Sequence, residues 1–338
     1  MGRLIWFSQI LCLSFMLLQF RVQSSSPSQS SLDSLLHLCR PEERSALLDF
    51  KSTTTNVFND VTHGLKTWNK SIDCCLWEGI TCDKTKDFGN NRLTGPIDHV
   101  EMPNIILQNV YLFNNEISGS IPSFFFDLVN LTSVDLSSNN LTGTITATML
   151  SKLVYLGYLD LSNNSLLSLS NNGTSINYSF PNLQYLLFSS CNIHKFPSFL
   201  RKAEKLQELD ISKNKISGQI HKWEIEGMSV NILNLAYNFL TDIVSFGFGN
   251  LEAVDLRSNL LQASLPILST TWDSMHQLYV SGNNLIGEIP SSYCNYTFLG
   301  VLVLANNSLR GKIPECLRNL RLSILDLRMN KFHVTWKF

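Results

Sequence analysis

Residues 299–314 read LGVLVLANNSLRGKIP, and the spacing of the leucines in this stretch decides the fold. Leu302 and Leu304 alternate with small residues, and Asn307 closes the phrase L-x-x-L-x-L-x-x-N. The phrase returns about every 24 residues, a period typical of solenoid repeats. The residues that close it are Asn115, Asn139, Asn164, Cys191, Asn214, Asn238, Asn259, Asn283, Asn307 and Asn330.

Each L-x-L segment predicts a short strand with its leucines pointing inward and its x residues outward. Since one coil cannot bury its own apolar edge, neighbouring coils must stack, and their strands then form one long parallel sheet. The closing asparagine is expected to be buried and to pair with backbone groups through both its donor and its acceptor. Cys191 fills this slot once and is our candidate for an unpaired thiol.

A second phrase, L-x-G-x-I-P, follows the asparagine. A residue without Cβ allows a tight turn there, and the Ile-Pro step favours extended backbone before a looser segment on the back of each coil. The glycines of this slot are Gly95, Gly119, Gly143, Gly218, Gly287 and Gly311.

The first residues have the pattern of a secretory signal peptide. Arg3 precedes a mostly apolar run over residues 4–20, which predicts a signal peptide over residues 1–24. We find no second run long enough to span a membrane, so the mature chain is expected to lack a membrane segment of its own. Entry into the secretory pathway makes the remaining cysteines candidates for disulfides.

Before the repeats, four cysteines surround two tryptophans. Residues 38–51 read LCRPEERSALLDFK, and residues 68–82 read WNKSIDCCLWEGITC. Pro41 begins a predicted short helix, which can cover the open end of the solenoid core. With L-x-G-x-I-P, these strings strongly resemble the N-terminal cap and repeats of plant extracellular leucine-rich-repeat receptors, above all the receptor-like proteins that lack a kinase and often serve in disease resistance.

The resemblance implies disulfides Cys39–Cys74 and Cys75–Cys82. Cys294 and Cys316 lie on adjacent coils, so a bridge between them is geometrically feasible, and the sequence leaves it open. Family members usually open with a strand after the cap, but residues 84–89 have no such pattern, so the first coil is expected to lack a recognisable strand. The repeats also stop without the further coils and membrane helix that are usual in the family.

The fold prediction is therefore an α/β solenoid. We expect a curved leucine-rich-repeat horseshoe with one long parallel sheet on its concave face and a disulfide-stapled helical cap. The expected divisions are the signal peptide 1–24, the cap 37–83 and the repeats 84–338, the last of them incomplete.

Outward x residues line the concave face, which is the usual binding surface of such arrays, and aromatic and Arg side chains often dominate interfaces. The aspartates among them have a second explanation, because Asp at this slot of the repeat can serve solubility or cap the strand. The candidate ligand-binding residues are Tyr111, Phe113, Tyr158, Tyr185, Glu208, Asp210, Glu252, Asp255, Arg257, Tyr279 and Arg328.

Sequons for N-glycosylation are dense, which is typical of an apoplastic protein. Three of them, Asn140, Asn163 and Asn306, adjoin closing asparagines and are expected to be less accessible. The complete set is Asn69, Asn130, Asn140, Asn163, Asn172, Asn177, Asn295 and Asn306.

The sequence contains no catalytic signature, no paired metal-ligand spacing and no cofactor motif. A net charge of −1 gives no electrostatic reason to expect nucleic acid as a partner. We therefore expect a non-enzymatic recognition module in the secretory pathway or apoplast, or at the plasma membrane if a longer anchored form exists. Its partners would be a protein, peptide or microbial ligand and a receptor-kinase co-receptor.

Two alternatives remain open from the sequence. The chain could be a soluble enzyme inhibitor similar to polygalacturonase-inhibiting proteins, which share the cap and the repeat. It could also be a non-functional, truncated receptor fragment, since Leu325 and Leu327 are expected to lack a covering neighbour.

Overall fold

A computed structural model describes most of the repeat region of the chain. The described residues are 44–45, 47–48, 85–97, 107–170, 178–225, 228–243, 251–265 and 274–333. The predicted signal peptide, the bridges Cys39–Cys74 and Cys75–Cys82, and the sequons at Asn69, Asn172 and Asn177 lie outside them. No helix within these ranges is long and apolar enough to cross a membrane.

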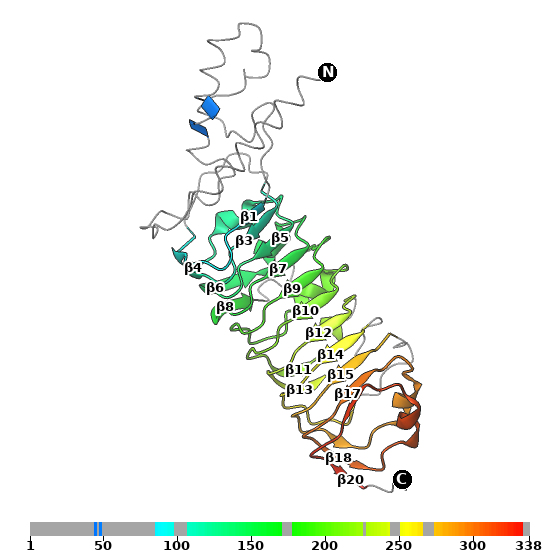
Figure 1. Ribbon diagram of the computed structural model, residues 1–338. Coiled ribbons are helices and arrows are strands. Elements are labelled where there is room, and N and C mark those ends of the chain that lie inside the picture. The colour runs from blue at the N-terminus through cyan, green and yellow to red at the C-terminus, as the bar shows by residue number, and fades with distance from the viewer. Residues whose placement is uncertain are drawn as a thin grey trace, which may run out of the picture.

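The described repeats form an elongated solenoid in which the strands of successive coils lie side by side (Figure 1). One eleven-stranded sheet, parallel at every pairing, runs along its length, which confirms the predicted architecture. Its strands in spatial order are β1 (Thr85–Asp87), β3 (Asn109–Tyr111), β5 (Ser133–Asp135), β7 (Tyr158–Asp160), β9 (Tyr185–Leu187), β10 (Glu208–Asp210), β12 (Ile232–Asn234), β14 (Ala253–Asp255), β15 (Gln277–Tyr279), β17 (Val301–Val303) and β19 (Ile324–Asp326).

The middle residue of each strand points into the core, as the period of two requires. Val110, Leu209 and Leu302 are each 0% exposed. Burying one such side chain contributes about 1.5–3 kcal/mol. The residues on either side of it point away from the core and form the outward face of the main sheet, which is the predicted concave face.

The second phrase of the repeat, L-x-G-x-I-P, forms short strands on another side of the coils. The glycines of this slot have φ between 82° and 94°, so a residue with Cβ would be strained there. The strands are β2 (Thr94–Gly95), β4 (Glu116–Ser120), β6 (Asn140–Thr146), β8 (Leu166–Ser170), β11 (Ser217–Ile220), β13 (Phe239–Ile243), β16 (Ile286–Gly287), β18 (Ser308–Gly311) and β20 (Lys331–Phe332).

Short helical segments complete the back of several coils. Four of them begin directly after a proline, whose ring fixes φ for the turn. They are η2 (Ser123–Asp127), α4 (Ala147–Ser151), η3 (Ser198–Lys202), α5 (Lys222–Ile225), η4 (Ser291–Asn295) and η5 (Glu315–Asn319).

The closing asparagines form a hydrogen-bonded ladder through the stack. Asn283 shows the pattern: its Nδ2 donates to the carbonyls of Leu256 at 2.9 Å and Val280 at 3.0 Å. Its Oδ1 accepts from the backbone N–H of Leu261 at 3.1 Å. Each asparagine thus joins its own coil to the preceding one, as the sequence predicted. Cys191 replaces it once with a thiol that donates to the Leu161 carbonyl, and the thiol is buried and unpaired.

The residue before each closing position has a left-handed backbone, which the sequence did not predict. Its φ lies between 51° and 66° in every described coil, from Asn90 to Met329. Only glycine adopts this conformation without cost, and Gly282 is the one glycine among them. Lys213, Tyr237 and Met329 adopt it because the chain must turn between the strand before them and the hydrogen-bonded asparagine after them.

The expectation that the first coil lacks a strand is wrong. β1 pairs in parallel with β3, and the backbone N–H of Phe88 donates to the Tyr111 carbonyl at 2.7 Å. Pairing of the backbone makes this strand, although Lys86 stands where other coils have an aliphatic residue. Asn91 then donates to the Phe88 and Gly89 carbonyls, as the later ladder asparagines do.

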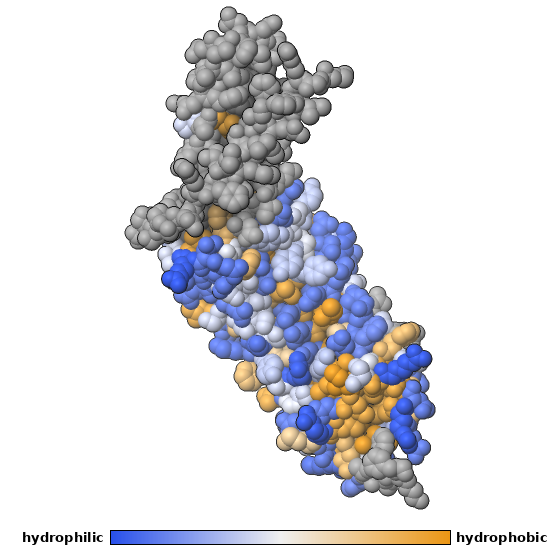
Figure 2. All heavy atoms as spheres, viewed as in Figure 1, coloured by the Kyte–Doolittle hydropathy of each residue, from blue (hydrophilic) through white to orange (hydrophobic). Residues whose placement is uncertain are grey.

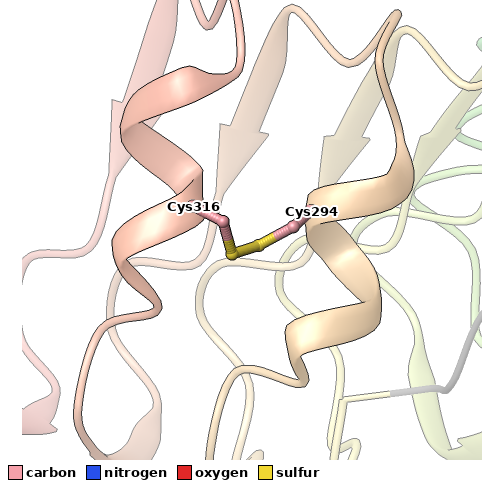
Figure 3. Close-up of a disulfide and its surroundings, with 2 residues drawn as sticks. All are labelled: Cys294 and Cys316. Carbon is pink, nitrogen blue, oxygen red and sulfur yellow. A yellow bond between two sulfur atoms is a disulfide. The ribbon is translucent and has the colours of Figure 1, made fainter.

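Two modification-related expectations are also decided by the structure. Cys294 of η4 and Cys316 of η5 form a disulfide between adjacent coils, with the two Cα atoms 5.6 Å apart (Figure 3).

The expectation that Asn140, Asn163 and Asn306 are less accessible is wrong, because all three are exposed. They adjoin the buried ladder but occupy positions that point outward.

Hydrophobic residues gather over the C-terminal coils in Figure 2. Leu325 occupies the inward position of β19, the last strand of the main sheet, yet it is 39% exposed. The equivalent Leu302 of β17 is fully buried because β19 covers it. The open end predicted for the last coil is therefore present among the described residues.

Candidate ligand-binding face

The candidate residues lie along one face because their strands share one register. Seven of them are strand residues that flank the buried middle position: Tyr111, Tyr158, Tyr185, Glu208, Asp210, Asp255 and Tyr279. Phe113, Arg257 and Arg328 stand two residues beyond a strand, at the next outward position. Glu252 precedes β14, and its carboxylate accepts from Asn231 Nδ2 at 3.0 Å, so it lies at the margin of the face.

The aspartates of the face have a structural role in every coil that contains one. Asp135, Asp160 and Asp210 each accept the backbone N–H of the residue two positions later, at 2.8–2.9 Å. Asp255 and Asp326 do the same for Arg257 and Arg328. The strand-capping explanation therefore holds for each of these aspartates.

Two of these carboxylates are neutralised within their own coil. The Arg257 guanidinium pairs with Asp255, with Nε 3.0 Å from a carboxylate oxygen, and lies 4.9 Å from the centre of the Tyr279 ring. This pairing raises the pKa of Arg257. Arg328 pairs with Asp326 in the same way at 2.7 Å, and the pKa of Asp326 is lowered as a result.

Five other carboxylates of the face have no such cation: those of Asp135, Asp160, Glu208, Asp210 and, at its margin, Glu252. No basic nitrogen of the described residues lies within 4.0 Å of them. Burial, and then the neighbouring Asp210, raise the pKa of Glu208. Burial and the neighbouring Asp135 likewise raise the pKa of Asp160, against the lowering effect of the Ser162 hydrogen bonds. The middle of the face therefore holds uncompensated negative charge.

Tyrosines stand beside these carboxylates. The rings of Tyr158 and Tyr185 are 6.1 Å apart on adjacent strands. Burial, and then Asp160, raise the pKa of Tyr158 to about 12, so its hydroxyl stays protonated and can donate a hydrogen bond. Ring faces of this kind attract cations as well as apolar groups.

An apolar segment of the face was missed by the sequence analysis. Val303 and Ile324 lie at outward strand positions of β17 and β19, where Val303 is half-buried and Ile324 is 49% exposed, whereas Val301 is buried. Leu187 and Ile232 lie at outward positions further along the sheet. Their x positions in the repeat are the signal that could have revealed them, because these positions point outward in every coil.

The described residues contain no group of three or more His, Cys, Asp and Glu side chains arranged to hold a metal ion. The face is thus built from carboxylates, tyrosines and aliphatic side chains. Such a surface can bind through charge, hydrogen bonds and apolar contact.

Family models match much of the chain. A leucine rich repeat N-terminal domain matches residues 40–83. Leucine rich repeat models match residues 106–166, 205–223, 274–296 and 298–320.

The curated relatives include receptor-like proteins of Arabidopsis thaliana. Receptor-like protein 7 is 40% identical over 44% of this chain and 15% of its own length. Receptor-like protein 49 is 35% identical over 71% of this chain and 31% of its own length. The chain thus spans less than a third of the length of these two relatives.

Solved structures share the fold. The plant peptide hormone receptor RGFR1 in complex with RGF2 has a TM-score of 0.57 at 23% identity, over 73% of this chain and 44% of that chain. A plant ice-binding protein has a TM-score of 0.60 at 24% identity, over 88% of this chain and 99% of that chain. At this identity the likeness establishes the solenoid and nothing more specific.

Proposed function

Because the chain belongs to the leucine-rich-repeat receptor-like proteins of plants, we propose that its concave face binds an extended peptide or protein segment outside the cell. In this proposal the chain is the ligand-recognising part of a receptor, and a receptor kinase is its second partner. A secretory route follows from the predicted signal peptide.

The observation that carries the proposal is the continuous face of the eleven-stranded sheet. Tyr158, Tyr185 and Tyr279 project from it among carboxylates, and Arg257 lies over one of the rings. Rigid aromatic and Arg side chains are the groups that most often dominate binding at interfaces.

The positions of the sequons support the same surface. None of the five described sequon asparagines is a residue of the main sheet. Asn140 lies in β6, Asn295 lies in η4, and Asn163 and Asn306 lie in the turns after the strands. Glycans at these positions would leave the strand residues of the concave face open to a ligand.

The relatives favour a peptide over a small molecule. One solved neighbour is described as a peptide hormone receptor bound to its peptide, on a solenoid of the same fold. An extended chain suits a long, shallow face, because it can contact the outward residues of many successive strands.

Peptide capture tests the proposal. The full chain is immobilised, peptides from plant apoplastic fluid are passed over it, and retained peptides are identified by mass spectrometry, resynthesised and titrated. We expect Tyr158→Ala with Tyr185→Ala to weaken binding by about tenfold or more. The matched control is Tyr155→Ala, which removes a 56% exposed tyrosine from the turn before β7.

Two outcomes contradict the proposal. Equal loss in the Tyr155 variant would show that the concave face is not the binding surface. Retention of a cell-wall hydrolase alone, with inhibition of its activity, would favour the enzyme-inhibitor alternative.

A further inference from the structure

The concave face changes in chemistry along the solenoid, and this change points to the character of its ligand. Uncompensated carboxylates lie over β5, β7 and β10, at Asp135, Asp160, Glu208 and Asp210. Aliphatic side chains take the outward positions over β17 and β19, where Val303 is half-buried and Ile324 is exposed.

Between the two segments, Glu252 lies at the margin of the face, and the strand carboxylate is neutralised within its own coil. Asp255 is paired with Arg257, and Arg257 in turn lies over Tyr279 of β15. Asp326, within the aliphatic segment, is paired with Arg328. A cationic ligand group is therefore attracted most strongly to the β5–β10 segment, where four carboxylates lie together and no cation of the described chain neutralises them.

We propose that the ligand is an extended peptide that places basic residues over β5–β10 and apolar residues over β15–β19. The inference rests on the proposed function and adds the chemistry and placement of the peptide. Tyr158 and Tyr185 stand on two adjacent strands of the basic subsite, where their rings flank an incoming Lys or Arg.

The sheet geometry sets the length of such a peptide. Eight steps separate β5 from β19 in the strand order. At about 4.8 Å a step this is about 38 Å, which an extended chain of about twelve residues spans.

The affinity for such a peptide should depend on salt concentration. The carboxylates are half-buried and close to one another, so pairing them with Lys or Arg releases mutual repulsion in a site partly shielded from water. Binding should weaken as ionic strength rises, because the exposed part of this attraction is screened.

Synthetic dodecapeptides test the proposal on the full chain. One peptide has three lysines in one half and Val, Ile and Leu in the other. A second replaces the lysines by glutamates, and a third replaces the aliphatic residues by serines. Binding is measured by fluorescence anisotropy, and a photo-crosslinking residue in each half locates that half on the sheet.

We expect the basic–apolar peptide to bind at least tenfold more tightly than either of the other two. Its basic half should crosslink to β5–β10 and its apolar half to β15–β19. Asp160→Asn with Asp210→Asn should weaken its binding about tenfold. The capping function survives these changes, because Asn234 accepts the N–H of Ala236 at the equivalent position of β12.

A matched control removes the same charge elsewhere. Glu116→Gln with Asp127→Asn changes two exposed carboxylates of β4 and η2, away from the main sheet, and should alter binding less than twofold. Equal binding of the acidic peptide, or an unchanged affinity in the Asp160/Asp210 variant, would overturn the inference. If apoplastic peptides still bind and still depend on Tyr158 and Tyr185, only this inference falls and the proposed function stands.

Discussion

At the scale of single residues, the buried asparagine is the group that allows the coils to stack. The chain turns away from the sheet after each strand, and this turn directs backbone groups into the interior. Asn283 is 7% exposed and satisfies carbonyls in two coils together with an N–H of the preceding coil. An unpaired buried backbone group costs about 1–3 kcal/mol, which explains why an amide with donor and acceptor occupies this slot.

Replacement of one ladder asparagine should therefore be costly. Asn283→Ala is expected to lower the free energy of unfolding by about 3 kcal/mol, because the backbone groups it serves lose their partners. Chemical denaturation measures the change.

The adjacent Asn284 offers the control, since it is exposed and its side chain makes no described hydrogen bond. Asn284→Ala should change stability by less than about 0.5 kcal/mol. Similar losses in the two variants would show that the ladder does not hold the coils together.

The carboxylate of Asp160, which we propose contributes to binding, has a cost in stability. Burial raises the pKa of Asp160, so the folded state disfavours its ionised form. The penalty is complete at neutral pH and is relieved as pH falls through the range in which the carboxyl takes up its proton.

Asp160→Asn should then be at least as stable as the parent chain at pH 7. The advantage of the variant should shrink as pH is lowered, because protonation removes the penalty from the parent. Thermal melts from pH 7 to pH 3 measure the difference. A variant less stable than its parent at pH 7 would mean that the capping hydrogen bond to Ser162 requires the charge.

At the scale of elements, the strands of the main sheet have only three residues each, so neighbouring coils supply most of their stability. The disulfide between η4 and η5 adds a covalent link between two coils near the C-terminal end. It closes a loop of 22 residues, a length for which cross-linking stabilises by about 3 kcal/mol.

Removing this disulfide should destabilise the coils around it before the rest. Cys294→Ser with Cys316→Ser is expected to cost about 2–4 kcal/mol. Hydrogen exchange should show lost protection in β15, β17 and β19, with β3 to β7 unchanged. A uniform loss along the solenoid would contradict this, since it would mean that the stack unfolds as a single unit.

At the scale of the whole molecule, the contribution of a leucine to stability depends on its place in the stack of coils. Leu278 of β15 lies between two coils and is 1% exposed. Leu325 occupies the same slot in β19, the last strand of the main sheet, and is 39% exposed.

The two leucines should respond differently to the same substitution. Leu278→Ala is expected to cost about 2–5 kcal/mol, because it leaves a cavity between two packed coils. Leu325→Ala should cost less than about 1.5 kcal/mol, because its side chain is already partly in water. Urea denaturation of both variants compares them. Equal costs would indicate that another surface covers the last coil in solution.

The sequence by itself determined the repeat, the inward leucines, the asparagine ladder and the glycine turns. These features depend only on contacts with the next coil, so a phrase such as the one ending at Asn307 contains all that is needed to predict them. The outward residues of the face, such as Tyr158 and Asp210, follow from the same alternation.

Only the tertiary structure decided the features of one coil that depend on the residues of the neighbouring coil. β1 forms without leucines because the backbone of β3 pairs with it. Tyr237 and Met329 take a left-handed backbone because the stacked turns require it. Arg257 pairs with Asp255 two residues before it, but it also lies over the ring of Tyr279 on the neighbouring strand, a contact that no local spacing encodes.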